Sequence, residues 1–141
     1  MEPPSTITRN DQLLPRRFLD QQLATFPALP LLSIKSIHLP WIIDVDAFHG
    51  FPVTLGDVFD SIYSSLRINV TPAEFNLFRQ EDRQRAVRAY ERRHRRLRSA
   101  STQDEEKRAG MKRIDFFMNR TMFCGISNAG GRPDEWELHV A

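Results

Sequence analysis

The clearest pattern in the chain is a run of apolar residues with helical spacing. Its members recur every three or four positions and fall on one face of a helix; they are Leu55, Val58, Phe59, Ile62, Tyr63 and Leu66. Thr54 precedes the run and Asp57 lies three positions later, which is the arrangement of a capping box. The pattern predicts a helix over residues 55–66. We expect Phe59, Ile62 and Leu66 to be deeply buried.

Further helices are predicted downstream. Thr71 is a suitable N-cap for a short helix over 72–78, because a proline and a glutamate occupy the first and third helical positions. A longer helix is predicted over 82–97, and we expect helix to resume over 102–109. The longer helix has a narrow apolar stripe that is expected to face the core, formed by Val87, Tyr90, His94 and Leu97.

Other segments alternate apolar and polar residues with the period of a half-buried strand. Trp41, Ile43 and Val45 alternate with Asp44 and Asp46. A strand is also predicted over 32–39, which is rich in β-branched and apolar residues, and further strands are predicted over 114–118, 121–127 and 136–140. The strand over 121–127 would place Cys124 inside a hydrophobic segment, where a cysteine behaves as a small buried apolar residue.

The predicted element order is β-β-α-α-α-β-β-β. Blocks of strands and helices are segregated, which favours an α+β fold with a mostly antiparallel sheet packed against helices. We expect a single domain over residues 31–141. Residues 1–30 hold five of the nine prolines and predict an extended arm with at most one short helix, around 18–24.

Composition narrows the class of protein. The chain has 141 residues, is 40% hydrophobic and contains ten Phe and two Trp, so it can bury a core. No apolar run reaches the roughly 18 residues of a membrane span, and we expect no membrane association. The first residues lack the pattern of a signal peptide. With Cys124 as the one cysteine, these features predict an intracellular protein, cytoplasmic or nuclear. No cofactor is predicted.

Charge is unevenly distributed. The net charge is only +2, but residues 79–113 contain 13 Lys or Arg against six Asp or Glu, a local charge of +7 that leaves −5 for the rest. Arg85, Arg88, Arg92 and Arg96 follow one side of the helix predicted over 82–97. Such a row of guanidinium groups suits phosphates of a nucleic acid or an acidic protein partner. It also suits a solvated helix face, and no nucleic-acid fold signature accompanies it.

One cluster has the chemistry of a metal site. Asp44 and Asp46 point to the same face of a strand, and a following turn could bring His49 beside them. Two carboxylates and an imidazole can hold a divalent cation that activates water. The polar face of an amphipathic strand explains the same two aspartates.

Several segments together resemble a known family. They are Leu39-Pro40-Trp41, Val53–Val58, Leu66–Phe75, Gly110–Phe116, Thr121–Ile126 and Trp136–Leu138. In order and spacing they resemble a family of small proteins expanded in mushroom-forming fungi and defined only as a domain of unknown function. The resemblance runs from about Ala24 to Ala141. Met122 and Cys124 depart from it, where a basic and an aliphatic residue are expected. It implies no activity, cofactor or catalytic residue.

Together these observations predict an intracellular interaction module rather than an enzyme, with an unknown protein as its partner. Nucleic-acid or acidic-partner binding through the arginine-rich helix is one alternative. A metal-dependent hydrolase that uses Asp44, Asp46 and His49 is another. The oligomeric state does not follow from the sequence.

Overall fold

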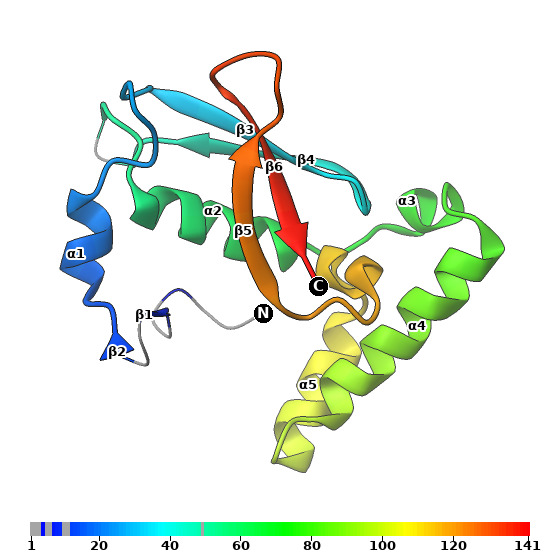
Figure 1. The fold of residues 1–141 in the computed structure, drawn as a ribbon. Coiled ribbons are helices and arrows are strands. Elements are labelled where there is room, and N and C mark those ends of the chain that lie inside the picture. The colour runs from blue at the N-terminus through cyan, green and yellow to red at the C-terminus, as the bar shows by residue number, and fades with distance from the viewer. Residues whose placement is uncertain (1–3, 5–6, 10–11, 49) are drawn as a thin grey trace. The chain divides into compact units, whose positions relative to one another are not determined.

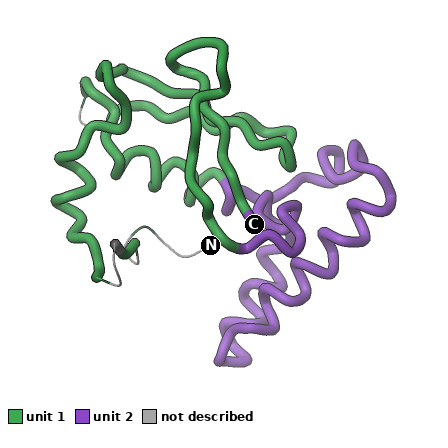
Figure 2. Tube along the Cα trace, viewed as in Figure 1, with its two compact units in different colours: residues 1–65, 122–140 green, residues 66–121, 141 purple. Residues whose placement is uncertain are grey.

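The computed structural model describes residues 4, 7–9, 12–48 and 50–141. Figure 1 shows the ribbon, and Figure 2 shows that the chain divides into two compact units. Unit 1 comprises residues 1–65 and 122–140, and unit 2 comprises residues 66–121 and 141. Within the part of the chain that the structure describes, no helix combines the length and apolar composition needed to cross a bilayer.

Unit 1 holds the strands and two helices. Its elements are β1 (Thr8–Arg9), β2 (Gln12–Leu13), α1 (Arg16–Gln21), β3 (Leu31–Ser36), β4 (Leu39–Asp46), α2 (Leu55–Leu66, except its last residue), β5 (Phe123–Asn128) and β6 (Glu135–Val140). Of the predicted proline-rich arm, residues 4, 7–9 and 12–30 are described, and they contain β1, β2 and α1.

A four-stranded sheet in the order β4-β3-β6-β5 forms the centre of unit 1. The β3–β4 and β5–β6 pairs are antiparallel, and the β3–β6 pair is parallel. The predicted α+β fold with a mostly antiparallel sheet is therefore confirmed. Pro40 lies in β4, which is an edge strand. An edge strand pairs with a neighbour on one side only, so it tolerates the missing N–H of a proline better than a central strand does.

Helix α2 lies along one face of this sheet (Figure 1). Its capping box forms as predicted, since the Thr54 N–H donates to the Asp57 carboxylate at 2.9 Å and the Asp57 N–H donates to the Thr54 hydroxyl at 3.2 Å. Ile62 is buried, as expected, but Phe59 is only half-buried. Its ring meets Phe123 of β5 edge to face, with centroids 5.7 Å apart, so the prediction of deep burial for Phe59 is wrong.

The strand predicted around Cys124 forms, but the cysteine is exposed rather than buried. β5 is an edge strand, and its pairing with β6 shifts register between Phe123 and Gly125. A register shift resets which side chains face inward. No residue of β5 is buried, so the alternation in this segment does not mark a core-facing side, and the prediction of a buried Cys124 is wrong.

Unit 2 is helical. It consists of α3 (Pro72–Asn76), α4 (Gln80–Arg95), α5 (Ala100–Ala109) and the 3₁₀ helix η2 (Arg113–Phe117). The predicted cap at Thr71 forms a complete capping box with Glu74. The α5 helix begins two residues earlier than predicted, because the hydroxyl of Ser99 accepts the Thr102 N–H.

The strand predicted over 114–118 is wrong, because this segment is η2. Lys112 is the N-cap residue of η2, and Asp115 is the third residue of that helix. The Asp115 carboxylate accepts the Lys112 N–H at 2.8 Å. The neighbours Phe116 and Phe117 are both buried, which a strand with one buried face does not permit. A short-range side-chain hydrogen bond and tertiary burial thus override the apparent alternation.

Replacing Thr71 by alanine is expected to lower the free energy of unfolding by about 1 kcal/mol, because the Glu74 N–H loses its acceptor. Glu74→Ala removes the reciprocal bond to the Thr71 N–H. Urea denaturation of both single variants and the double variant measures the coupling. The double loss should be smaller than the sum of the single losses, and strict additivity would contradict a reciprocal box.

Candidate anion-binding site

The site begins with the orientation of α4. Ala86 and Ala89 are its buried residues, and Arg93 extends the same side at helical spacing. The predicted apolar stripe is only half-buried, so the side that faces the interior of unit 2 differs from the one predicted. The small side chains of the two alanines allow close packing. Arg93 can point inward because its guanidinium pairs with the buried carboxylate of Asp115.

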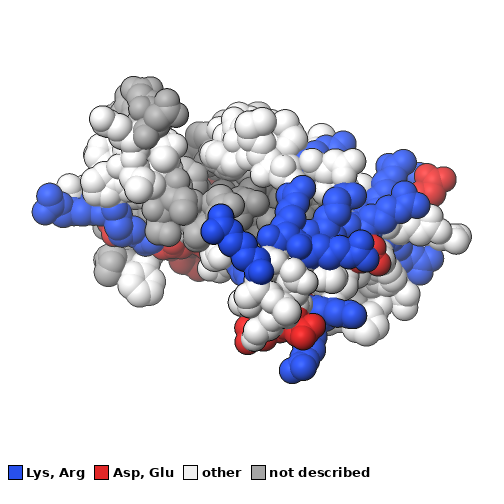
Figure 3. Space-filling model, turned by 90° about the horizontal axis from the view of Figure 1, so that it is seen from below, with Lys and Arg blue, Asp and Glu red and all other residues white. Residues whose placement is uncertain are grey.

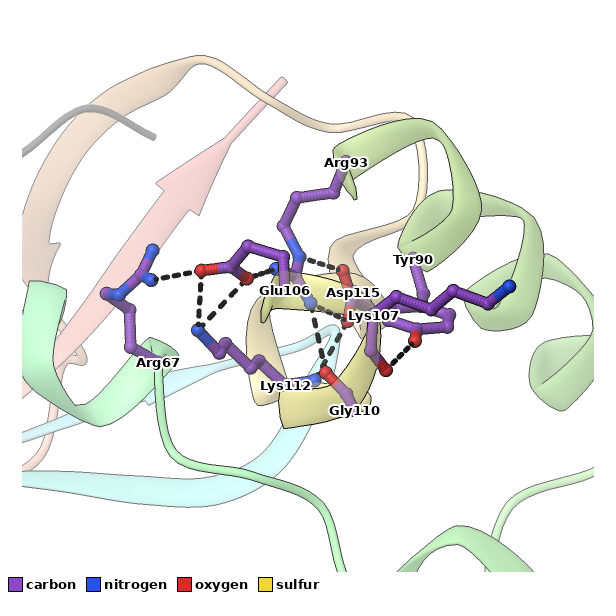
Figure 4. Close-up of polar contacts among 8 residues, drawn as sticks. All are labelled: Arg67, Tyr90, Arg93, Glu106, Lys107, Gly110, Lys112 and Asp115. Carbon is purple, nitrogen blue, oxygen red and sulfur yellow. Dashed lines mark hydrogen bonds and ion pairs between the residues drawn. The ribbon is translucent and has the colours of Figure 1, made fainter. Parts of the chain in front are cut away.

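Arg93 is the centre of an ion-pair network, which we define as Arg67, Arg93, Glu106, Lys112 and Asp115 (Figure 4). Its Nε and Nη2 donate to the two carboxylate oxygens of Asp115 at 2.8 and 3.0 Å. This is the bidentate geometry in which an arginine binds a carboxylate most strongly. The side chain of Asp115 is 1% exposed. The pair therefore fixes η2 against α4.

Glu106 of α5 joins the same network. It pairs with Arg93, with Lys112 Nζ at 3.2 Å and with Arg67 Nη2 at 3.1 Å. Burial by itself would raise the pKa of Glu106, but Lys112 and then Arg93 hold that pKa below its ordinary value. Burial likewise opposes the charge of Arg93, while Asp115 and Glu106 raise its pKa. The network thus ties α4, α5 and η2 together.

Glu106→Gln is expected to lower the free energy of unfolding at pH 7 by roughly 1–3 kcal/mol, because charged hydrogen bonds are lost. The folded pKa of Glu106 lies below its ordinary 4.5. Its contribution is therefore present above pH 4.5 and is lost as the pH falls through the lower folded pKa. Urea denaturation at pH 7 and pH 3 should show the variant and wild type converging in acid. The exposed neighbour Glu105→Gln is the control, and an equal effect there would contradict the assignment.

Immediately after η2 the chain turns back toward α4. Met118 has a φ of 62°, a backbone conformation that a non-glycine residue adopts at some cost. Its N–H donates to the Asp115 carbonyl at 3.1 Å, and the Arg120 N–H donates to the Phe117 carbonyl at 3.0 Å. Arg92 Nη2 donates to Asn119 Oδ1 at 2.7 Å. These three hydrogen bonds hold residues 118–120 beside α4.

Between these two segments lies a hollow of about 620 Å³, which we name the arginine hollow. Its lining residues, all in unit 2, are Arg85, Arg88, Arg92, Met118, Asn119, Arg120 and Ala141. The four arginines are exposed. No Asp or Glu is among the lining residues, and the described part of the chain contains no ion pair of Arg85, Arg88 or Arg120.

Figure 3 shows Lys and Arg side chains lying side by side on the face that it presents, with few acidic side chains among them. Three of the four arginines predicted from the sequence, Arg85, Arg88 and Arg92, line one hollow. Arg96 does not line it. Arg120 and Asn119 were missed, because their approach to α4 depends on the turn at Met118 and not on any local pattern.

The predicted metal cluster is described only in part. Asp44 and Asp46 are exposed at alternate positions of β4, and the Ser33 hydroxyl donates to Asp44 at 3.2 Å. His49 lies outside the described residues. Among the residues that the structure does describe, no three His, Cys, Asp or Glu side chains gather as a metal site would require. The metal-dependent hydrolase stays a prediction.

A serine and a histidine meet on the β5–β6 pair, a contact that the sequence analysis did not foresee. Ser127 Oγ is hydrogen-bonded to His139 Nε2 at 2.6 Å. Both residues are exposed, and the described residues provide no carboxylate bonded to the His139 ring. In the common catalytic arrangement, the base that activates a nucleophile is itself oriented by a third group. The contact is explained as a surface bond across two strands.

These features define a small α+β protein whose helical unit carries a hollow lined by four arginines, with no Asp or Glu among the lining residues. The chain belongs to a family of unknown function, DUF6699, which matches residues 1–134. Neither the curated proteins nor the solved structures contain a match to the chain.

Proposed function

We propose that the protein is a binding module that recognises an anionic partner through the arginine hollow. The observation that supports this function best is the gathering of Arg85, Arg88, Arg92 and Arg120 around one hollow that has no Asp or Glu among its lining residues. Like charges held together repel one another, and a bound anion relieves that repulsion. Each guanidinium also presents a planar set of donors that fits carboxylates and phosphates.

The electrostatics of unit 2 agree with this function. Two acidic side chains of unit 2 are engaged in the ion-pair network: Glu106 and Asp115 neutralise Arg93, Lys112 and Arg67. The inward-facing arginine is therefore structural, while the outward-facing ones keep their charge available. This division of roles on one helix distinguishes the proposed site from a uniformly solvated face.

We further propose that the module works inside the cell, in the cytoplasm or nucleus, and that it is of fungal origin, as its sequence pattern suggests. An acidic protein surface and a nucleic acid both provide suitable anionic groups. Catalysis is not part of the proposal.

The experiment compares two charge-matched double variants. Arg85→Gln with Arg88→Gln removes two cations that line the arginine hollow, and Arg95→Gln with Arg98→Gln removes two exposed cations that do not. Binding to fluorescent poly-glutamate and to a 12-nucleotide single strand is measured by anisotropy at several salt concentrations. The first variant should bind at least about 10-fold more weakly. For the nucleic acid, the slope of the logarithm of the binding constant against the logarithm of the salt concentration should fall in magnitude by roughly 1.4.

The second double variant should lose no more than about 2-fold, since distant exposed charges act weakly through salt. Equal losses in both variants would show non-specific attraction to a basic protein and would overturn the site. Absence of binding by the wild type to both probes would overturn an acidic protein or a nucleic acid as the partner.

A further inference from the structure

We propose that the arginine hollow binds one compact anion with several linked phosphate groups, such as a triphosphate. This inference rests on the proposed function, because it names the class of anion that the same residues accept. The shared chemistry is the polyphosphate chain, whether inorganic or attached to a nucleoside.

The first argument is convergence. Arg85, Arg88 and Arg92 come from α4, whereas Arg120 comes from the segment after η2. The cations therefore surround one hollow rather than follow a single line. Four guanidinium groups balance the roughly four negative charges of a triphosphate near neutral pH. Arginine forks also bind phosphate oxygens in pairs.

The second argument is size. The hollow measures about 620 Å³, within the range of about 300–1,000 Å³ that small-molecule sites occupy. Arg85 and Arg92 are separated by seven helical residues, about 10 Å along the axis. A chain of three phosphates can reach arginines at both ends of this distance. A single phosphate can reach only part of the set, and we therefore expect it to bind much more weakly.

The third argument is preorganisation. The side chain of Arg92 is already held by Asn119 at 2.7 Å. The strained φ of Met118 lies in the segment that carries Arg120, and such backbone strain recurs at ligand-binding sites. Arg93 and Asp115 fix η2 immediately before that segment. Because Arg92 is held before the ligand binds, ordering its side chain adds less to the entropy cost of binding.

The fourth argument concerns what borders the hollow. Arg88 also lines a neighbouring hollow of about 560 Å³, and Glu91 is among the residues of that second hollow. The first turn of α4 carries Glu81 and Asp82. An extended polyanion that continued along α4 would meet these carboxylates. The positions of the acids therefore favour a compact ligand over a long nucleic acid or an acidic polypeptide.

The test measures binding of four probes to the full chain by isothermal titration calorimetry in one buffer without divalent cations. The probes are sodium tripolyphosphate, orthophosphate, ATP and a 12-nucleotide single strand. Tripolyphosphate should bind one to one and at least about 10-fold more tightly than orthophosphate, since it engages more arginines. ATP of equal or greater affinity would support an organic triphosphate. ATP that binds much more weakly than tripolyphosphate would support an inorganic chain.

Variants connect the binding to the hollow. Arg88→Gln and Arg120→Gln should each weaken tripolyphosphate binding by about 10-fold or more, the loss expected for a charge-assisted hydrogen bond. Arg95→Gln, an exposed arginine outside the hollow, should stay within about 2-fold of wild type. Far-UV circular dichroism confirms that each variant is folded. All three substituted positions are exposed arginines, so misfolding is not expected to mask the result.

Three outcomes separate this inference from the proposed function. Tripolyphosphate that binds no more tightly than orthophosphate, or equally well to Arg88→Gln, overturns the inference. If the single strand or poly-glutamate still binds in a manner that depends on Arg85 and Arg88, the proposed function stands and only the ligand class is wrong. If no anion binds the wild type, both fail.

Discussion

Asp115→Ala is expected to destabilise unit 2 by about 3–5 kcal/mol, the range found when one member of a buried ion pair is removed. The side chain of Asp115 is 1% exposed and accepts three hydrogen bonds, two from the Arg93 guanidinium and one from the Lys112 N–H. Alanine leaves a half-buried guanidinium and a buried N–H without these acceptors. Neither group can turn to bulk water without opening the contact between α4 and η2.

The measurement is guanidinium chloride denaturation followed by far-UV circular dichroism. Asp104→Ala is the matched control, because Asp104 is exposed on α5 and lies outside the ion-pair network. It should change the free energy of unfolding by no more than about 0.5 kcal/mol. A loss in Asp115→Ala as small as in this control would show that the network contributes little to the stability of unit 2.

Phe116→Ala is expected to cost about 3–5 kcal/mol, the range for emptying a core aromatic site. Phe116 is 1% exposed. Its ring stacks on Phe78 with centroids 4.0 Å apart and meets Phe75 nearly edge-on at 6.4 Å. Alanine loses both aromatic contacts and leaves a cavity between η2 and α3. The neighbouring buried Phe117 limits how far this region can collapse to fill it.

The control for Phe116 is Leu77→Ala. Leu77 is apolar and directly precedes Phe78, yet it is 85% exposed. Its truncation should stay within about 0.5 kcal/mol of wild type in the same denaturation experiment. Equal losses in the two variants would contradict the placement of Phe116 at the core of unit 2.

Several elements could be predicted because their signals are local. The capping boxes at Thr54 and Thr71 form as the sequence indicates, since an N-cap and its third residue lie within one helical turn. The helical spacing of apolar residues before Leu66 likewise predicts α2. The strands of the sheet were found by their alternation, although the parallel pairing of β3 with β6 joins segments about one hundred positions apart and has no local signal.

The same local reasoning failed where tertiary contacts decide. Residues 114–118 alternate like a strand, but the Asp115 carboxylate and the burial of two adjacent phenylalanines make them a 3₁₀ helix. Arg93 lies outside the apolar stripe predicted for its helix, and a charged side chain is rarely buried without a partner. Its partners, Glu106 and Asp115, lie 13 and 22 positions away. No pattern within one helix could identify them.

The amino-acid sequence by itself determined the fold class, the caps of two helices and the basic character of α4, because each depends on residues within a few positions of one another. Tertiary structure alone decided which arginine faces inward and which surround the arginine hollow. It placed Arg120 and Asn119 beside Arg85, Arg88 and Arg92, through a turn at Met118 that directly follows η2, the helix that Asp115 joins to Arg93 of α4. Burial and charge pairing between residues far apart in the sequence fix the positions of these side chains. The energy of a charge pair depends on the distance between the charges in space rather than on their separation along the chain.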